Sequence, residues 1–138
     1  MHNTANETFQ AWPTIISSAD PIMIDYLGYN DDGDFLAILE IGSNIALRKV
    51  QVRIGGLSYV KLSPESFVEH YWGLELGSTF MVENSSWLRE VAERNPLFIE
   101  EKREVKHWVI MCDDFAIDIL SNSPVCIELC NESLVDRD

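Results

Sequence analysis

The sequence predicts an α+β domain in which a mainly antiparallel β-sheet is accompanied by two short helices, packed on one face or end. Short β-forming runs are separated by tight turn signals, so neighbouring strands are expected to pair as hairpins. One run alternates apolar and polar residues with a period of two, which is typical of a strand with one wet face. Two helix-start signals fall together in the middle of the chain, between two groups of strands.

The first group of strands begins after Pro13 and Pro21. Ile22–Tyr29 and Phe35–Ile41 are rich in residues that favour strands. Residues 30–34 between them include Asp-Gly, which adopts positive φ at low cost and so favours a hairpin turn.

The alternating run occupies residues 47–54, with Val50, Val52 and Ile54 on one side and polar residues on the other. A Gly-Gly pair then breaks the pattern. Residues 57–62 are either a fourth strand or a loop that leads to the first helix.

The first helix is expected from Ser63 to Gly73. Ser63 can accept a hydrogen bond from a free backbone N–H, Pro64 suits the first helical position, and glycine commonly ends helices. The second helix starts at residues 84–86 and runs to about Arg94, just before an Asn-Pro stop.

Three more strands complete the predicted order. Residues 105–112 and 115–120 are joined by a two-aspartate turn, and Val125–Leu129 follows after a second turn. The strands therefore fall into two sequence-local groups on either side of the helices.

The chain of 138 residues is expected to form a single domain, residues 1–138, because it has no internal repeat and no linker long enough to divide it. Its ends, residues 1–12 and 131–138, are expected to be loose, and Phe9 and Trp12 are the residues that could pin the first of them.

Acidic residues are concentrated towards both ends of the chain. The formal net charge is −13. Residues 1–47 hold seven acidic and no basic side chains, residues 48–106 hold nine of each, and residues 107–138 hold seven acidic side chains and one arginine. This charge disfavours binding to nucleic acid or to an anionic membrane, whose phosphates require Lys and Arg. A basic protein is the complementary partner, and plain solubility is the alternative explanation.

The sequence indicates a cytoplasmic protein. Its N-terminal residues lack the basic and apolar regions of a secretory signal, and no apolar run approaches the roughly 20 residues that span a bilayer. The odd number of cysteines argues against a secreted disulfide framework. Cys126 and Cys130 lack a fourth ligand at zinc spacing, so neither a metal nor a cofactor is expected.

No recognised catalytic motif is present. Residues 30–34 do not fit a calcium loop, because its first and last ligand positions would hold no oxygen-bearing side chain. His70 or His107 could act as a general base with Asp118, but neither accompanies a known nucleophile motif. An enzyme of unfamiliar type is thus the least favoured of three function classes.

The segment HWVIMCDDFAIDILSNS, residues 107–123, resembles a hairpin found in small bacterial immunity proteins. Such hairpins combine an aromatic strand, an acidic turn and a returning strand with an acid. The matching residues here are Trp108, Asp113 with Asp114, and Asp118. The resemblance implies a protein that binds and blocks a co-encoded toxin, often a basic nuclease.

We therefore expect a non-enzymatic binding protein that neutralises a cationic protein, as an immunity protein does. Acids from both ends of the chain would pair with the partner's Lys and Arg, and exposed aromatics in residues 71–80 would anchor the complex. The expected partner-binding residues are Asp31, Asp32, Asp34, Tyr71, Trp72, Asp113, Asp114 and Asp118. The alternative is a small-ligand-binding domain or a scaffold subunit. Acids gathered on one face would favour the inhibitor, and acids spread evenly would favour the alternative.

Overall fold

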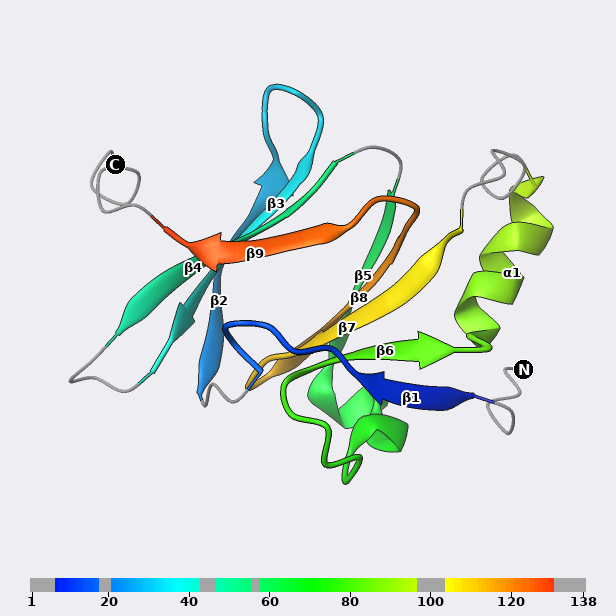
Figure 1. Ribbon diagram of the computed structural model, residues 1–138, viewed down its shortest axis with the longest axis horizontal. Coiled ribbons are helices and arrows are strands. Elements are labelled where there is room, and N and C mark those ends of the chain that lie inside the picture. The colour runs from blue at the N-terminus through cyan, green and yellow to red at the C-terminus, as the bar shows by residue number, and fades with distance from the viewer. Residues whose placement is uncertain (1–6, 18–20, 43–46, 56–57, 97–103, 131–138) are drawn as a thin grey trace.

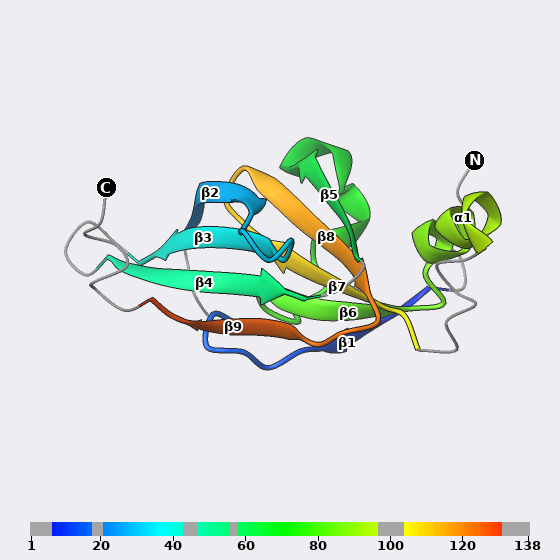
Figure 2. The same ribbon diagram turned by 90° about the horizontal axis from the view of Figure 1, so that it is seen from above.

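The computed structural model describes residues 7–17, 21–42, 47–55, 58–96 and 104–130. Most of the chain is antiparallel β-structure, arranged as two sheets that face each other (Figures 1 and 2). The expectations of loose ends at residues 1–6 and 131–138 lie outside the described residues. None of the described helices is both long enough and apolar enough to cross a membrane.

The four-stranded sheet contains the first predicted group of strands, joined by the last strand of the chain. Its order is β2-β3-β4-β9. The predicted hairpin at residues 30–34 is confirmed, because Tyr29 pairs with Phe35 on either side of it. The strands are β2 (Ile22–Tyr29), β3 (Phe35–Ile41), β4 (Arg48–Ile54) and β9 (Val125–Leu129).

The five-stranded sheet has the order β1-β6-β7-β8-β5. Two of its strands were not predicted: β1 lies in the segment expected to be a loose arm, and β6 begins within the last two residues of the segment expected to be an exposed loop, residues 71–80. Each is short, and they pair with each other at the edge that β1 forms. The strands are β1 (Thr8–Ala11), β6 (Thr79–Glu83), β7 (Lys106–Met111), β8 (Phe115–Ser121) and β5 (Ser58–Pro64).

The main core fills the space between the two sheets. Alternate residues of β3 and β4 point inward, as the period-two pattern predicted, and meet aliphatic side chains of β7 and β8. Each fully buried Val, Leu or Ile of this layer stabilises the fold by about 1.5–3 kcal/mol relative to an exposed position. The least exposed members include Leu39, Val50, Ile54, Ile110, Ile117 and Ile119.

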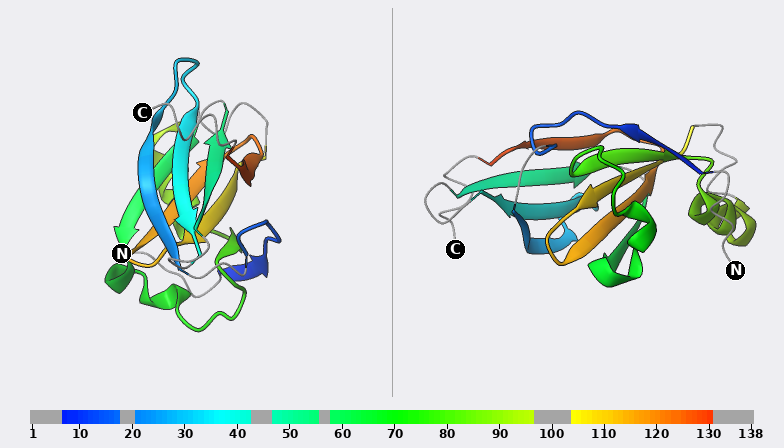
Figure 3. Two further views of the ribbon diagram at one scale, coloured as in Figure 1. Left: turned by 90° about the vertical axis from the view of Figure 1, so that its left-hand side faces the viewer. Right: turned by 90° about the horizontal axis from the view of Figure 1, so that it is seen from below.

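The outer face of the five-stranded sheet is covered by the helical segments, which project from the same side of the molecule (Figure 3). The predicted helix from Ser63 to Gly73 is not an α-helix. It is replaced by two 3-10 turns, η1 (Glu65–Phe67) and η2 (Glu69–Tyr71). Strand β5 continues to Pro64, and the Glu65 N–H donates to the Asp114 carbonyl, so the backbone at the predicted helix start is committed to the sheet.

The second predicted helix is confirmed as α1 (Ser86–Arg94). Ser85 is its N-cap, and the Ser85 Oγ accepts a hydrogen bond from the Leu88 N–H at 3.0 Å. Val91 and neighbouring apolar residues pack this helix against Leu120 of β8. The α+β class and the antiparallel pairing are thus confirmed, whereas the second α-helix is absent from the part of the chain that the structure describes.

Candidate functional site

Polar side chains are buried between the two segments that cover the five-stranded sheet. Tyr71 ends η2, Ser85 precedes α1, His107 lies on β7 and Asp118 lies on β8. None of the four is more than 7% exposed. We call these four residues the buried polar cluster. They lie between an apolar cluster under the 3-10 turns and a second apolar cluster under α1.

A continuous chain of hydrogen bonds joins the cluster. His107 Nε2 lies 2.7 Å from Asp118 Oδ2, and His107 Nδ1 lies 2.7 Å from Ser85 Oγ. The Tyr71 hydroxyl donates to the same Asp118 oxygen. These contacts are all satisfied when a neutral imidazole donates from Nε2 to the carboxylate and accepts the Ser85 hydroxyl at Nδ1.

Burial is the main reason why the pKa of Tyr71 is raised far above its ordinary value, and the negative charge of Asp118 raises it further. The phenol therefore keeps its proton and remains a hydrogen-bond donor. The other carboxylate oxygen, Asp118 Oδ1, is buried and accepts no hydrogen bond from the described residues. A buried acceptor without a hydrogen bond destabilises the folded state by about 1–3 kcal/mol.

A cavity of about 290 Å³ adjoins the cluster on the side of the 3-10 turns. Tyr71, His107 and Asp118 contribute to its wall, together with aromatic and polar side chains from β5, η1 and α1. Lys61 Nζ lies 4.4 Å from the ring centroid of Trp87, a cation–π contact at this cavity. The remaining lining residues are Glu7, Ser63, Phe67, Val68, His70 and Ser86.

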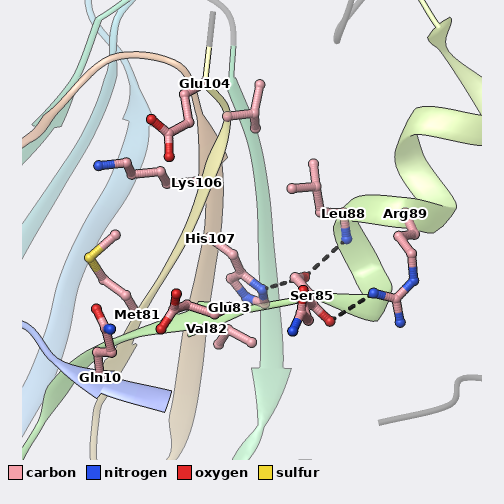
Figure 4. Close-up of a pocket in the computed structure, with 12 residues that line it drawn as sticks. Gln10, Met81, Val82, Glu83, Ser85, Leu88, Arg89, Glu104, Lys106 and His107 are labelled. Carbon is pink, nitrogen blue, oxygen red and sulfur yellow. Dashed lines mark hydrogen bonds between the residues drawn. The ribbon is translucent and has the colours of Figure 1, made fainter. Parts of the chain in front are cut away.

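A second cavity of about 640 Å³ lies on the other side of His107, between β6, β7 and the start of α1 (Figure 4). Its wall has mixed charge, with Glu83 and Glu104 opposing Arg89 and Lys106. Figure 4 shows the Ser85 side chain hydrogen-bonded to both His107 and the backbone of α1. His107 therefore separates two cavities and contributes to both walls.

The two predicted acidic turns, β2–β3 and β7–β8, lie at opposite edges of the molecule in Figure 1, whereas Asp118 lies within β8. Asp31, Asp32 and Asp34 belong to the β2–β3 turn. The β7–β8 turn instead lies beside the other end of β2, where the Asp113 N–H donates to the Ile22 carbonyl at 2.8 Å. The eight residues of β2 separate the two turns by roughly 25 Å at 3.3 Å per residue. The two acidic turns therefore lie too far apart to form one compact acidic patch.

Two of the predicted partner-binding residues are not at the surface. Asp118 is 0% exposed and Tyr71 is 7% exposed, and they hydrogen-bond each other. The prediction that Tyr71 and Asp118 are surface contacts is therefore wrong. Strand β8 is covered on both faces, so the Asp118 side chain points into the buried polar cluster. Trp72, the next residue after Tyr71, is 52% exposed, as expected.

The structure adds residues to the acidic group around the β7–β8 turn. Glu65, Phe67 and Glu69 lie in the 3-10 turns next to it and are exposed. We call the exposed group the acidic end; it consists of Glu65, Phe67, Glu69, Trp72, Asp113 and Asp114. This grouping could not be predicted from local sequence patterns, because it depends on the hydrogen bond from Glu65 to Asp114 and on the pairing of Pro64 with Phe115.

Ser85 was recognised in the sequence only as part of a helix start. Its second contact, to His107, joins residues 22 positions apart and could not be read from local pattern. Among the described residues, no group of His, Cys, Asp and Glu is arranged to hold a metal ion. No protein-family model, curated protein or solved structure matches the chain.

Proposed function

We propose that the protein binds and neutralises a basic protein partner through the acidic end, acting in the cytoplasm in the manner of a toxin-immunity protein. The observation that supports this proposal is the exposure of two large aromatic side chains among four carboxylates. Phe67 is 77% exposed and Trp72 is 52% exposed. The four exposed carboxylates belong to the same 3-10 turns and to the β7–β8 turn hydrogen-bonded to them, and are those of Glu65, Glu69, Asp113 and Asp114.

This combination suits a protein interface for two physical reasons. Exposed aromatic rings gain most from desolvation, and such rings dominate the energetics of many interfaces. Carboxylates around them attract a basic surface and accelerate its association. Val68 and Tyr71 pack into the apolar cluster beneath the 3-10 turns, so Phe67 and Trp72 are presented by a firmly attached segment.

The first experiment is affinity capture from the source organism, followed by binding measurements with the purified partner. The test variant is Glu65→Gln/Glu69→Gln, which removes two charges from the acidic end. The matched control is Asp31→Asn/Asp32→Asn, which removes two charges from the opposite end. We expect affinity to fall at least tenfold in the test variant and to change little in the control. Equal losses would show that only net charge matters and would contradict the proposed surface.

A second candidate function is acyl transfer, favoured by one specific observation. Ser85, His107 and Asp118 form a hydroxyl–imidazole–carboxylate chain next to a cavity, which is the arrangement that activates a serine nucleophile. Against it, Ser85 is only 3% exposed, and its hydroxyl already caps α1. The binding function is therefore preferred.

A fluorophosphonate probe decides between the two candidates. Covalent labelling of the wild-type protein that disappears in Ser85→Ala would establish a nucleophilic serine. Unlabelled wild-type protein, beside a serine hydrolase labelled in the same conditions, would remove the acyl-transfer candidate.

A further inference from the structure

We infer that the cavity between the 3-10 turns and α1 is a binding site for one organic cation, an ammonium or guanidinium group, held by Asp118 and by the aromatic walls. The inference deepens the proposed function, since a Lys or Arg side chain of a basic partner is one source of such a group. A free small-molecule amine is the other source.

The first reason is the unused oxygen of Asp118. Tyr71 and His107 both donate to Oδ2, whereas Oδ1 accepts no hydrogen bond from any described residue. Asp118 is 0% exposed and belongs to the wall of the cavity. A group with N–H donors that enters the cavity would complete the hydrogen bonding of this carboxylate, and a positively charged group would do so most strongly.

The second reason is the aromatic character of the walls. Phe67, Tyr71 and Trp87 come from the two segments that flank the cavity. Lys61 already places its ammonium 4.4 Å from the centroid of Trp87. This contact demonstrates that a cation is accommodated on that ring, which is the interaction by which aromatic cages hold ammonium groups.

The third reason is the charge balance around the cavity. The acidic side chains in its wall are Glu7 and Asp118, and the basic ones are Lys61 and two histidines, His70 and His107. Glu7 is engaged with the start of α1, since its Oε2 accepts from the Ser86 N–H and hydroxyl. Lys61 pairs with Asp118 across β5 and β8, but the two form no ion pair. An incoming cation would therefore reach a carboxylate with which no described Lys or Arg forms an ion pair, and the exposed Lys61 would be its like-charged neighbour in the wall.

The test is a titration of the full chain with n-butylguanidinium. Binding is monitored through the NMR signal of the Trp87 indole N–H. We expect a saturable shift, and no comparable shift with the neutral 1-butanol. Asp118→Asn should reduce the affinity at least tenfold. Lys61→Met should raise the affinity about fivefold, because it removes a like charge at the site.

Two tryptophan variants guard against effects of misfolding. Trp87→Leu, monitored through the His107 ring signals, should weaken binding because it removes a wall. Trp72→Leu, which removes an exposed tryptophan outside the cavity lining, should leave butylguanidinium binding unchanged. Equal binding by wild-type protein and Asp118→Asn, or no saturable response in the wild type and Lys61→Met, would overturn the inference.

A second titration distinguishes the two sources of the cation. It uses the peptide acetyl-Gly-Arg-Gly-amide, with its citrulline analogue as the uncharged control. Tighter binding of the arginine peptide than of butylguanidinium supports a side chain of a protein partner. Tighter binding of butylguanidinium supports a small-molecule amine. A basic partner that binds the acidic end while no cation enters the cavity would overturn this inference and leave the proposed function intact.

Discussion

His107 and Asp118 are diagonal neighbours on the β7–β8 hairpin, and their side chains meet on its outer face at 2.7 Å. Asp118 pairs directly with Val109, two residues along β7 from His107. The pair is bonded further to Ser85 at the start of α1 and to Tyr71 at the end of η2. It therefore links the sheet to both segments that cover its outer face, and its loss is expected to weaken the packing of each.

Tyr71→Phe removes the hydroxyl that donates to Asp118 and keeps the ring. Asp118 Oδ2 would retain only the donor from His107. We expect the free energy of unfolding, measured by urea titration, to fall by about 1–3 kcal/mol. Tyr29→Phe is the control, since that side chain is 63% exposed; it should change stability by less than about 0.5 kcal/mol. Equal losses in both variants would show that the buried hydrogen bond has no special role.

Two substitutions of Ser85 separate its role as N-cap from its contact with His107. Both variants lose the hydroxyl and its contact with His107, but glycine is itself a tolerated N-cap residue whereas alanine is not, so only Ser85→Ala also loses most of the capping preference. We expect Ala to lower the free energy of unfolding by about 2–3 kcal/mol and Gly by about 1 kcal/mol, the latter because His107 Nδ1 loses its donor. Wild-type stability in the Gly variant would show that the His107 contact contributes nothing.

Because of Cys112, the free energy of unfolding is expected to depend on pH in the alkaline range. Burial, with a smaller contribution from the charge of Asp113, raises the pKa of its thiol from 9.0 to about 12. Above pH 9 the unfolded chain loses this proton while the folded chain keeps it, so the stabilisation present below pH 9 is lost as pH rises towards 12. We expect the free energy of unfolding to fall between pH 8.5 and 10, with a smaller fall in Cys112→Ala. Identical slopes for the two proteins would contradict the assignment.

Gly77 cannot accept a side chain without disturbing a backbone contact. It has φ +89°, and an added Cβ would lie 2.5 Å from the Ser17 carbonyl oxygen, which accepts the Ser78 N–H. Gly73 also has positive φ, +78°, but space for a Cβ is open there. We expect Gly73→Ala to lower the free energy of unfolding by about 1 kcal/mol, because alanine disfavours this backbone conformation. Gly77→Ala should lower it clearly more, and thermal unfolding of both variants measures the difference. A smaller cost at Gly77 would contradict the close approach.

The proposed electrostatic attraction also predicts a salt dependence. Added salt screens exposed carboxylates, so the association rate with a basic partner should fall as ionic strength rises, while dissociation changes less. Stopped-flow measurements at several salt concentrations test this. An association rate that is independent of salt would remove the electrostatic part of the proposed function.

Much of the fold could be predicted from the sequence because its signals are local. Period-two alternation and an Asp-Gly turn specify β2, β3 and β4, and Ser85 specifies the start of α1. The prediction of an α-helix after Ser63 was wrong for a non-local reason. The proline and glycine of this segment resemble helix boundaries, but pairing with β8 extends β5 to Pro64 and leaves room only for 3-10 turns. The strands β1 and β6 are short, and both depend on pairing with residues distant in the chain, β1 with β6 and β6 with β1 and β7.

By itself the sequence determined most of the strand-forming segments, the excess of negative charge and the identity of the acids at each turn, because these depend on composition and on residues close together in the chain. Only the tertiary structure decided which acids are exposed and which residues meet. Asp118 is on a central strand that is covered on both faces, so no alternation marks its burial. Its partners Tyr71 and His107 lie 47 and 11 positions away, and Ser85 lies 22 positions from His107. Such contacts arise from sheet order and from the packing of the covering segments, neither of which is encoded in a local pattern.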